Sequence, residues 1–253
     1  MMRKTAFTLA AILSLSACRQ NESELTNGTA VQQQTPTDTA AADLAPPTSC
    51  RLQAPRFLTP EEGTADASLK VFLDNLQRAV QTQNAEQLKQ LVSQDVRTGF
   101  DGSGGWSSFS QQWHPEDPHA ELWLLLEHLL RLGGGYPLED NNSLYALPYV
   151  YSNWPDTVDA FAHVAVVNAG ATLRKEPGAN ADAICTLERV ILQANYEKSY
   201  PQQQKGRQLE WWHVQSADGS TQGYLSHTDV YSPVGYRAIL NRNKQGKWQL
   251  TAL

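Results

Sequence analysis

The spacing of apolar residues changes near Phe161, and this change constrains the fold more than any other feature of the sequence. Before it, apolar residues recur three and four positions apart, at Leu69, Phe72, Leu73, Leu76 and Val80. After it, short apolar runs such as "AHVAVV", "AICTL" and "EWWHV" are separated by turn residues, among them Asp218-Gly219. The chain therefore predicts an α+β protein, with a mainly helical α+β region over residues 64–160 and a small unit of short strands over residues 161–232.

Local signals place several element boundaries. Asn84 stands before an apolar stretch, with Gln87 three residues later, which predicts the N-cap of a short helix. The apolar face of that helix is expected to hold Leu88, Leu91 and Val92. Residues 120–132, "AELWLLLEHLLRL", predict a longer helix that ends at three glycines. Residues 143–154, "SLYALPYVYSNW", are aromatic and broken by a proline, which predicts an extended segment. Residues 233–253 predict a final hairpin that turns at Lys244-Gln245-Gly246.

The first residues, "MMRKTAFTLAAILSLSAC", predict a leader. Arg3 and Lys4 precede an apolar run too short to cross a bilayer as a helix, so residues 1–17 are interpreted as a signal peptide. The segment Leu15-Ser16-Ala17-Cys18 resembles a bacterial lipobox. The resemblance implies cleavage before Cys18 and a lipid anchor on its sulfur, and an ordinary secreted protein is the alternative. Because Arg19 is not an aspartate, the outer membrane, facing the periplasm, is the expected location.

Residues 18–63 are rich in Gln, Thr, Ala and Pro and contain few large apolar side chains. Such a composition cannot bury enough surface to offset its conformational entropy, so this segment is expected to be a disordered tether. The whole chain has 20 Lys and Arg against 26 Asp and Glu, a net charge of −6. Without a basic stripe to neutralise phosphates, nucleic acid is not an expected partner.

Only three cysteines occur, and Cys18 is assigned to the lipid. In an oxidising compartment, a disulfide between Cys50 and Cys185 is the only intramolecular pairing that remains. Two unpaired thiols are the alternative.

Two separated motifs in the strand-rich part carry a resemblance. The first is "VVNAGATLRKEPGANA" at residues 166–181, in which Leu173, Arg174 and Pro177 are the matching positions. The second is "WWHVQSADGSTQGYL" at residues 211–225. Together they resemble the bacterial SH3 (SH3b) family over residues 164–231. This sequence departs from the family pattern at Ala169-Gly170 and by an insertion at residues 193–210.

The resemblance implies an SH3-like β-barrel that binds peptidoglycan or an envelope protein, or that has a purely intramolecular role. The candidate ligand contacts that it implies are Arg174, Glu176, Trp211, Tyr224, His227 and Asp229. Tyr and Trp supply flat amphipathic area, and Arg offers a fork for carboxylates such as peptide termini.

A second resemblance joins the two ends of the ordered chain. Residues 66–154 contain a helical stretch, "FLDNLQRAVQTQNAEQLKQLVSQDV", followed by a Gly-rich turn, and the final hairpin closes with the strand in "GKWQLTAL". Together they resemble the cone-shaped α+β fold of nuclear-transport-factor-2-like proteins. It implies that the SH3-like unit is inserted before the final hairpin or packs beside it. It also implies an alternative function, in which the protein binds or hydrolyses a small molecule and the SH3-like unit is a buttress.

One polar cluster has the residue types of a catalytic or metal site. Residues 113–123, "WHPEDPHAELW", place His114, Glu116, Asp117 and His119 within six residues. The prolines keep this run out of a helix and no His-Glu-x-x-His spacing occurs, so Asp117 is expected instead to be a helix N-cap, followed by Pro118 in the first turn. His128, within an apolar helix, is expected to be a core histidine whose hydrogen bonds are satisfied.

The sequence also lacks a Cys–His hydrolase motif, a Gly-x-Ser-x-Gly motif and a phosphate-binding loop. We therefore expect no catalytic residues, no metal and no cofactor. The preferred interpretation is a membrane-anchored, non-catalytic binding or adaptor protein. It requires an aromatic and arginine patch on the strand-rich unit, whereas the alternative requires a concave pocket with convergent polar groups.

Overall fold

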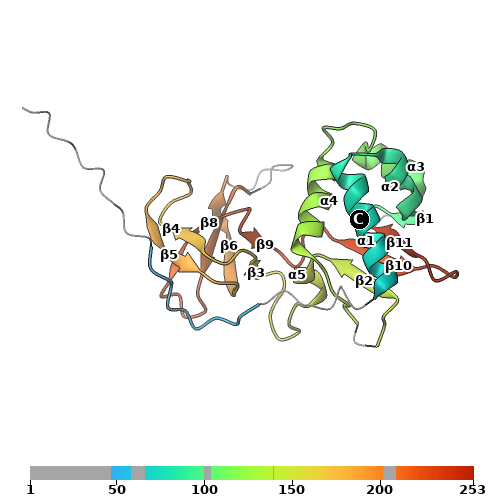
Figure 1. Ribbon diagram of the computed structural model, residues 1–253. Helices are drawn as coiled ribbons and strands as arrows, with labels where there is room; N and C mark the ends of the chain where they lie inside the picture. The colour runs from blue at the N-terminus through green and yellow to red at the C-terminus, as the bar shows by residue number, and fades with distance from the viewer. Residues whose placement is uncertain (1–46, 58–65, 100–103, 139, 202–208) are drawn as a thin grey trace, which may run out of the picture. The chain divides into compact units, whose positions relative to one another are not determined.

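The computed structural model describes residues 47–57, 66–99, 104–138, 140–201 and 209–253 (Figure 1). Within these ranges the chain forms five α-helices and eleven β-strands in two sheets, so the expected α+β class is confirmed. No helix in the described part of the chain is both long and apolar enough to cross a membrane. The signal peptide, the lipidation site at Cys18 and the tether as far as residue 46 lie outside the described residues.

The first sheet has four strands in the order β1-β11-β10-β2. Their bounds are β1 Val92–Arg97, β11 Trp248–Ala252, β10 Ala238–Arg242 and β2 Leu144–Leu147. β1 runs parallel to β11, whereas β10 is antiparallel to both of its neighbours. The final hairpin, β10 and β11, therefore lies between β1 and β2, although β1 and β2 both precede the second sheet in the chain. The second sheet is thus inserted in the chain before the final hairpin, one of the two arrangements considered from the sequence.

Four helices accompany this sheet: α1 Ala67–Gln81, α2 Ala85–Leu91, α3 Gly105–Trp113 and α4 Glu121–Leu132. Figure 1 shows α1 and α4 over one face of the sheet. Alternate residues of β10 and β11 point toward them, so Leu240 and Leu250 are fully buried in one apolar cluster with Leu69, Leu76 and Leu126. The opposite face of these strands carries Ile239 and Ala252, which are only partly buried.

The second sheet has seven strands in the order β5-β4-β8-β7-β6-β3-β9, and every described pairing is antiparallel. The bounds are β3 His163–Val166, β4 Ala171–Arg174, β5 Ala183–Leu187, β6 Ile191–Tyr200, β7 Trp211–Gln215, β8 Gln222–Ser226 and β9 Val230–Tyr231. A separate apolar cluster lies within it, formed by residues such as Val166, Leu173, Leu192 and Leu225. The described strands do not close into a ring, because the order begins at β5 and ends at β9.

Several local predictions are confirmed and one is wrong by a residue. Asn84 caps α2, since its side-chain oxygen accepts a hydrogen bond from the Gln87 amide at 3.0 Å. The final hairpin turns where expected, with Gly246 at a positive φ of 76°. Val92, however, begins β1 and pairs with Leu250 instead of extending the helix. Its extended backbone is one that β-branched residues favour.

Two further predictions are corrected. Asp117 does not cap α4, which begins at Glu121 after Ala120. The Asp117 carboxylate instead accepts the His119 amide at 2.8 Å, and its carbonyl accepts the Trp123 indole N–H at 3.0 Å. It therefore closes an Asx turn ahead of the helix. The segment expected to be extended up to residue 154 is a strand only as far as Leu147. The short helix α5 (Tyr149–Ser152) follows Pro148, because a fixed φ and a missing N–H suit the start of a helix.

The tether was predicted to continue to residue 63, and for residues 47–57 this is wrong. A disulfide joins Cys50 to Cys185 in β5, and the Cys50 amide donates to the Thr186 carbonyl at 2.8 Å. Further along, Phe57 is buried and stacks on Tyr149 with ring centroids 5.1 Å apart. The segment thus covers the open edge of β5. The disulfide and the buried Phe57 ring supply the stabilisation that its polar composition does not provide.

Candidate functional site

Three of the residues predicted to bind a ligand share one face of the seven-stranded sheet. Arg174 of β4 is paired with Tyr224 of β8, and Tyr224 is paired with His213 of β7. Trp211 lies two residues before His213 on the same strand, so it points to the same face. We call Arg174, Trp211, His213 and Tyr224 the sheet-face cluster. His213 was not predicted, although its alternation with Trp211 was a signal that could have indicated it.

Contacts within the sheet-face cluster hold its side chains in place. The rings of Tyr224 and His213 meet edge to face, with centroids 5.0 Å apart. The Arg174 guanidinium donates to the Ala181 carbonyl at 2.6 Å across the turn between β4 and β5. Arg174, Trp211 and Tyr224 are all partly exposed, so a cation and two aromatic rings are accessible on one surface.

His213 is the buried member of this cluster, with 5% of its surface exposed. Its Nδ1 finds no hydrogen-bond partner among the described residues. Burial, followed by the nearby Lys198 charge, lowers the pKa of His213 below its ordinary value. The imidazole is therefore held neutral at the base of the cluster, where it supports Tyr224 without adding charge.

The other three predicted contacts are not brought together with the cluster. Glu176 is exposed in the turn after β4, and His227 is exposed after β8, where its amide donates to the Glu210 carbonyl. Asp229 accepts a hydrogen bond from the Asn168 side chain at 2.9 Å, and its carbonyl accepts the Val167 amide. Asp229 thus ties the end of β3 to the start of β9, a structural role.

The polar cluster at residues 114–119 forms connections between helices. His114 ends α3 with a left-handed backbone, and Glu116 accepts the Ser110 hydroxyl at 2.8 Å. Among the described residues, no group of three His, Cys, Asp or Glu side chains is arranged to hold a metal ion.

His128 is only half-buried, so its prediction as a core histidine is wrong in degree. Its ring stacks on Tyr231 with centroids 5.4 Å apart, on the surface of α4. Burial, then the charges of Arg131 and His227, lowers the pKa of His128.

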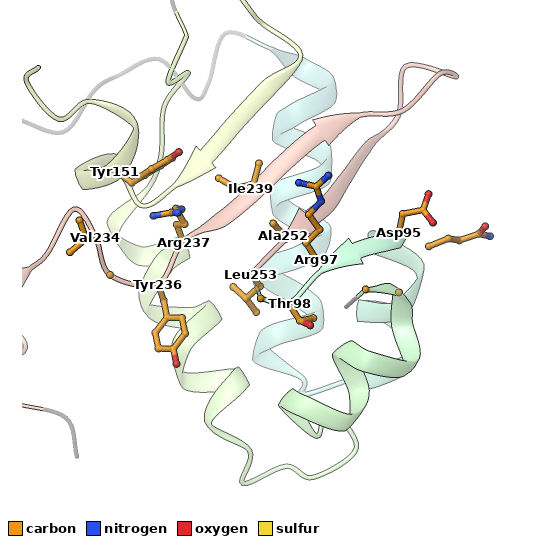
Figure 2. Close-up of a pocket in the computed structure, with 15 residues that line it drawn as sticks. Asp95, Arg97, Thr98, Tyr151, Val234, Tyr236, Arg237, Ile239, Ala252 and Leu253 are labelled. Carbon is orange, nitrogen blue, oxygen red and sulfur yellow. The ribbon is translucent and has the colours of Figure 1, made fainter. Parts of the chain in front are cut away.

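A cavity of about 1080 Å³ lies on the open face of the four-stranded sheet (Figure 2). Its lining comes from β1 and the turn before α3, from α5, from the segment 234–237 and from the last two strands. Three charged side chains line it: Asp95, Arg97 and Arg237. The Arg237 guanidinium lies over the ring of Tyr151, 4.6 Å from its centroid. The sequence does not indicate this cavity, because its walls come from segments far apart in the chain.

No family model matches the chain, and a search of curated proteins finds no significant match.

Proposed function

We propose that this protein is a lipid-anchored, periplasm-facing binding or adaptor protein without catalytic activity, and that its sheet-face cluster binds peptidoglycan or an envelope protein. The observation that carries the proposal is the common face of Arg174, Trp211 and Tyr224. These residues come from three adjacent strands and from two motifs about forty residues apart, and the register brings them together.

The chemistry of the cluster suits a peptide ligand. A guanidinium donates two parallel hydrogen bonds to a carboxylate, and neighbouring Tyr and Trp rings bury apolar side chains at low entropic cost. A lipid on Cys18 would keep such a face near the wall, so that a weak contact becomes effective through high local concentration.

We further infer that the seven-stranded sheet is an SH3b-like unit. In support of this, the two motifs that carry the resemblance form β3–β4 and β7–β8, and they pack around one apolar cluster of their own. Gly223 also fits tightly, because a Cβ there would lie 2.5 Å from the Arg174 carbonyl oxygen. β4 and β8 therefore approach closely where the cluster is built.

The alternative function, small-molecule binding within a cone, requires polar groups between the helices and the four-stranded sheet. That space is filled by apolar side chains, among them Phe109, Trp123 and Leu240. A cavity with convergent charged groups, Asp95, Arg97 and Arg237, lies instead on the open face of that sheet, so the alternative keeps a candidate pocket there. We prefer the adaptor function because three of its predicted contacts share one face.

The test is retention on purified peptidoglycan. The whole chain carrying Cys18→Ser, which removes the lipid, is compared with the same chain carrying Arg174→Ala and Tyr224→Ala. Arg78→Ala with Phe161→Ala is the matched control, since both are exposed and lie outside the cluster. We expect the cluster variant to bind at least about tenfold more weakly, a loss of about 1.4 kcal/mol.

Thermal unfolding must first show that the cluster variant is folded. No retention of any form would reject peptidoglycan as the ligand and leave an envelope protein. Equal retention of all forms would reject the sheet-face cluster as the binding surface.

A further inference from the structure

We propose that the cavity on the four-stranded sheet binds a short acidic peptide with a free amino group. This site is separate from the sheet-face cluster, and its ligand does not depend on the function proposed above.

The size of the cavity suits such a ligand. Its volume of about 1080 Å³ is at the upper end of the range for small-molecule sites, which is about 300–1,000 Å³. The base is formed by Ile239 and Ala252, whose side chains lie on the face of the sheet that the helices leave open. A peptide backbone of two or three residues fits in this space.

The charged side chains of the lining indicate which charges a ligand should carry. Arg97 and Arg237 reach the cavity from different segments, β1 and the residues before β10. Neither forms an ion pair with a carboxylate in the described part of the chain. Two such guanidinium groups in one cavity of a protein with a net charge of −6 attract an anion to this place.

The Tyr151 ring orients one of these groups. The Arg237 guanidinium lies over the Tyr151 ring, 4.6 Å from its centroid, and this cation–π contact holds it at the cavity wall. Figure 2 shows this pair at the cavity wall opposite Asp95. A planar, bidentate partner such as a carboxylate matches the fork of a guanidinium better than a spherical anion.

Asp95 supplies the third charge. It lies two residues before Arg97 on β1, roughly 7 Å away along the backbone, and both residues line the cavity. An ammonium group at Asp95 and a carboxylate at Arg97 are thus separated by about the length of two extended residues. Two arginines and one aspartate thus complement two carboxylates and one ammonium, the charges of an acidic dipeptide.

Apolar side chains complete the site at its rim. Val234 and Tyr236 are exposed by 41% and 53%, which is high for side chains of their size. The Tyr236 ring is held edge to face against Trp113, with centroids 5.6 Å apart. These side chains can cover the aliphatic part of a bound peptide.

The experiment titrates the whole chain carrying Cys18→Ser with three peptides by calorimetry. The probes are Ala-Glu, N-acetyl-Ala-Glu, which lacks the ammonium, and Ala-Gln, which lacks the side-chain carboxylate. We expect Ala-Glu to bind and each of the other probes to bind about tenfold more weakly. Arg97→Gln and Arg237→Gln should each weaken Ala-Glu by a similar factor, while Arg78→Gln on α1 is the matched control.

Asp95→Asn separates this proposal from general attraction of anions. It should weaken Ala-Glu but leave N-acetyl-Ala-Glu unchanged, because that probe has no ammonium to lose. The absence of saturable binding of Ala-Glu at concentrations up to about 10 mM would overturn the proposal. So would binding that neither arginine substitution weakens.

Discussion

Asp66 shows how one side chain connects two distant parts of the fold. Its carboxylate caps α1 by accepting the amides of Ser68 and Leu69, and it also pairs with Arg242 at the end of β10. Arg242 in turn lies over the ring of Trp248, 5.0 Å from its centroid. Burial raises the pKa of Asp66, but the hydrogen bonds from Ser68, Leu69 and Arg242 outweigh it and lower the pKa to about 2.

Replacing Asp66 should therefore separate the contribution of helix capping to stability from the contribution of the carboxylate charge. Asp66→Ala removes the cap and should lower the free energy of unfolding by about 1–2 kcal/mol at neutral pH. Asp66→Asn keeps an oxygen for the amides and should lose less. Because the folded pKa is below the unfolded value, the stability due to this carboxylate is present above about pH 4 and lost as pH falls toward 2.

Urea unfolding between pH 2.5 and 6 measures this effect. The difference between the wild type and Asp66→Asn should narrow as the solution is acidified. A difference that stays constant over this pH interval would contradict the assigned role of the charge.

Among single residues, the sequence predicted part of the candidate site. Trp211 and Tyr224 could be placed near Arg174 because motif order and strand alternation are local properties. The role of Asp229 could not be predicted, because it depends on Asn168, a partner 61 residues away. His128 was placed too deeply for a similar reason, since helical spacing does not reveal how much of a ring the neighbouring strand leaves exposed.

At the scale of elements, residues 47–57 form a strap that composition alone could not reveal. The strap is the described segment from Pro47 to Phe57. The disulfide and a backbone bridge at Ser49 attach it to β5, and a bridge at Arg56 attaches it to Val190, just before β6. The few apolar residues of the strap predict disorder, but its partners lie far along the chain, 92 residues later for Phe57 and Tyr149 and 135 residues later for Cys50 and Cys185. The cavity could not be predicted for the same reason, because its walls come from distant segments. The helices and the final hairpin depend on local signals and were largely predicted.

Removing the disulfide should release this strap. The bond closes a sequence separation of 135 residues, so Cys50→Ser with Cys185→Ser should lower the free energy of unfolding by about 2–5 kcal/mol. Limited proteolysis should then cut within residues 47–57, and urea unfolding gives the magnitude. The reduced wild type should behave like the variant, and an unchanged unfolding midpoint in both would show that Phe57 and the backbone bridges hold the strap alone.

At the scale of the whole molecule, location follows from the proposed lipid anchor. Cys18→Ser should move the protein from the membrane fraction to the soluble fraction, because two or three acyl chains supply the anchoring energy. Arg19→Asp should keep it in the membrane fraction but shift it toward the inner membrane. Membrane fractionation with immunodetection follows both changes, and a Cys18→Ser protein that still sediments with membranes would reject the lipid as the anchor.

The position of the final hairpin also has a consequence for how the protein is made. β10 and β11 separate β1 from β2 in the sheet, yet they are synthesised after all the other described elements. Until about residue 252 has left the ribosome or an export channel, the apolar faces of α1 and α4 have no sheet to cover. The seven-stranded unit, whose strands follow one another in the chain, can fold during synthesis. The helical region made before it must wait until β11 has been made.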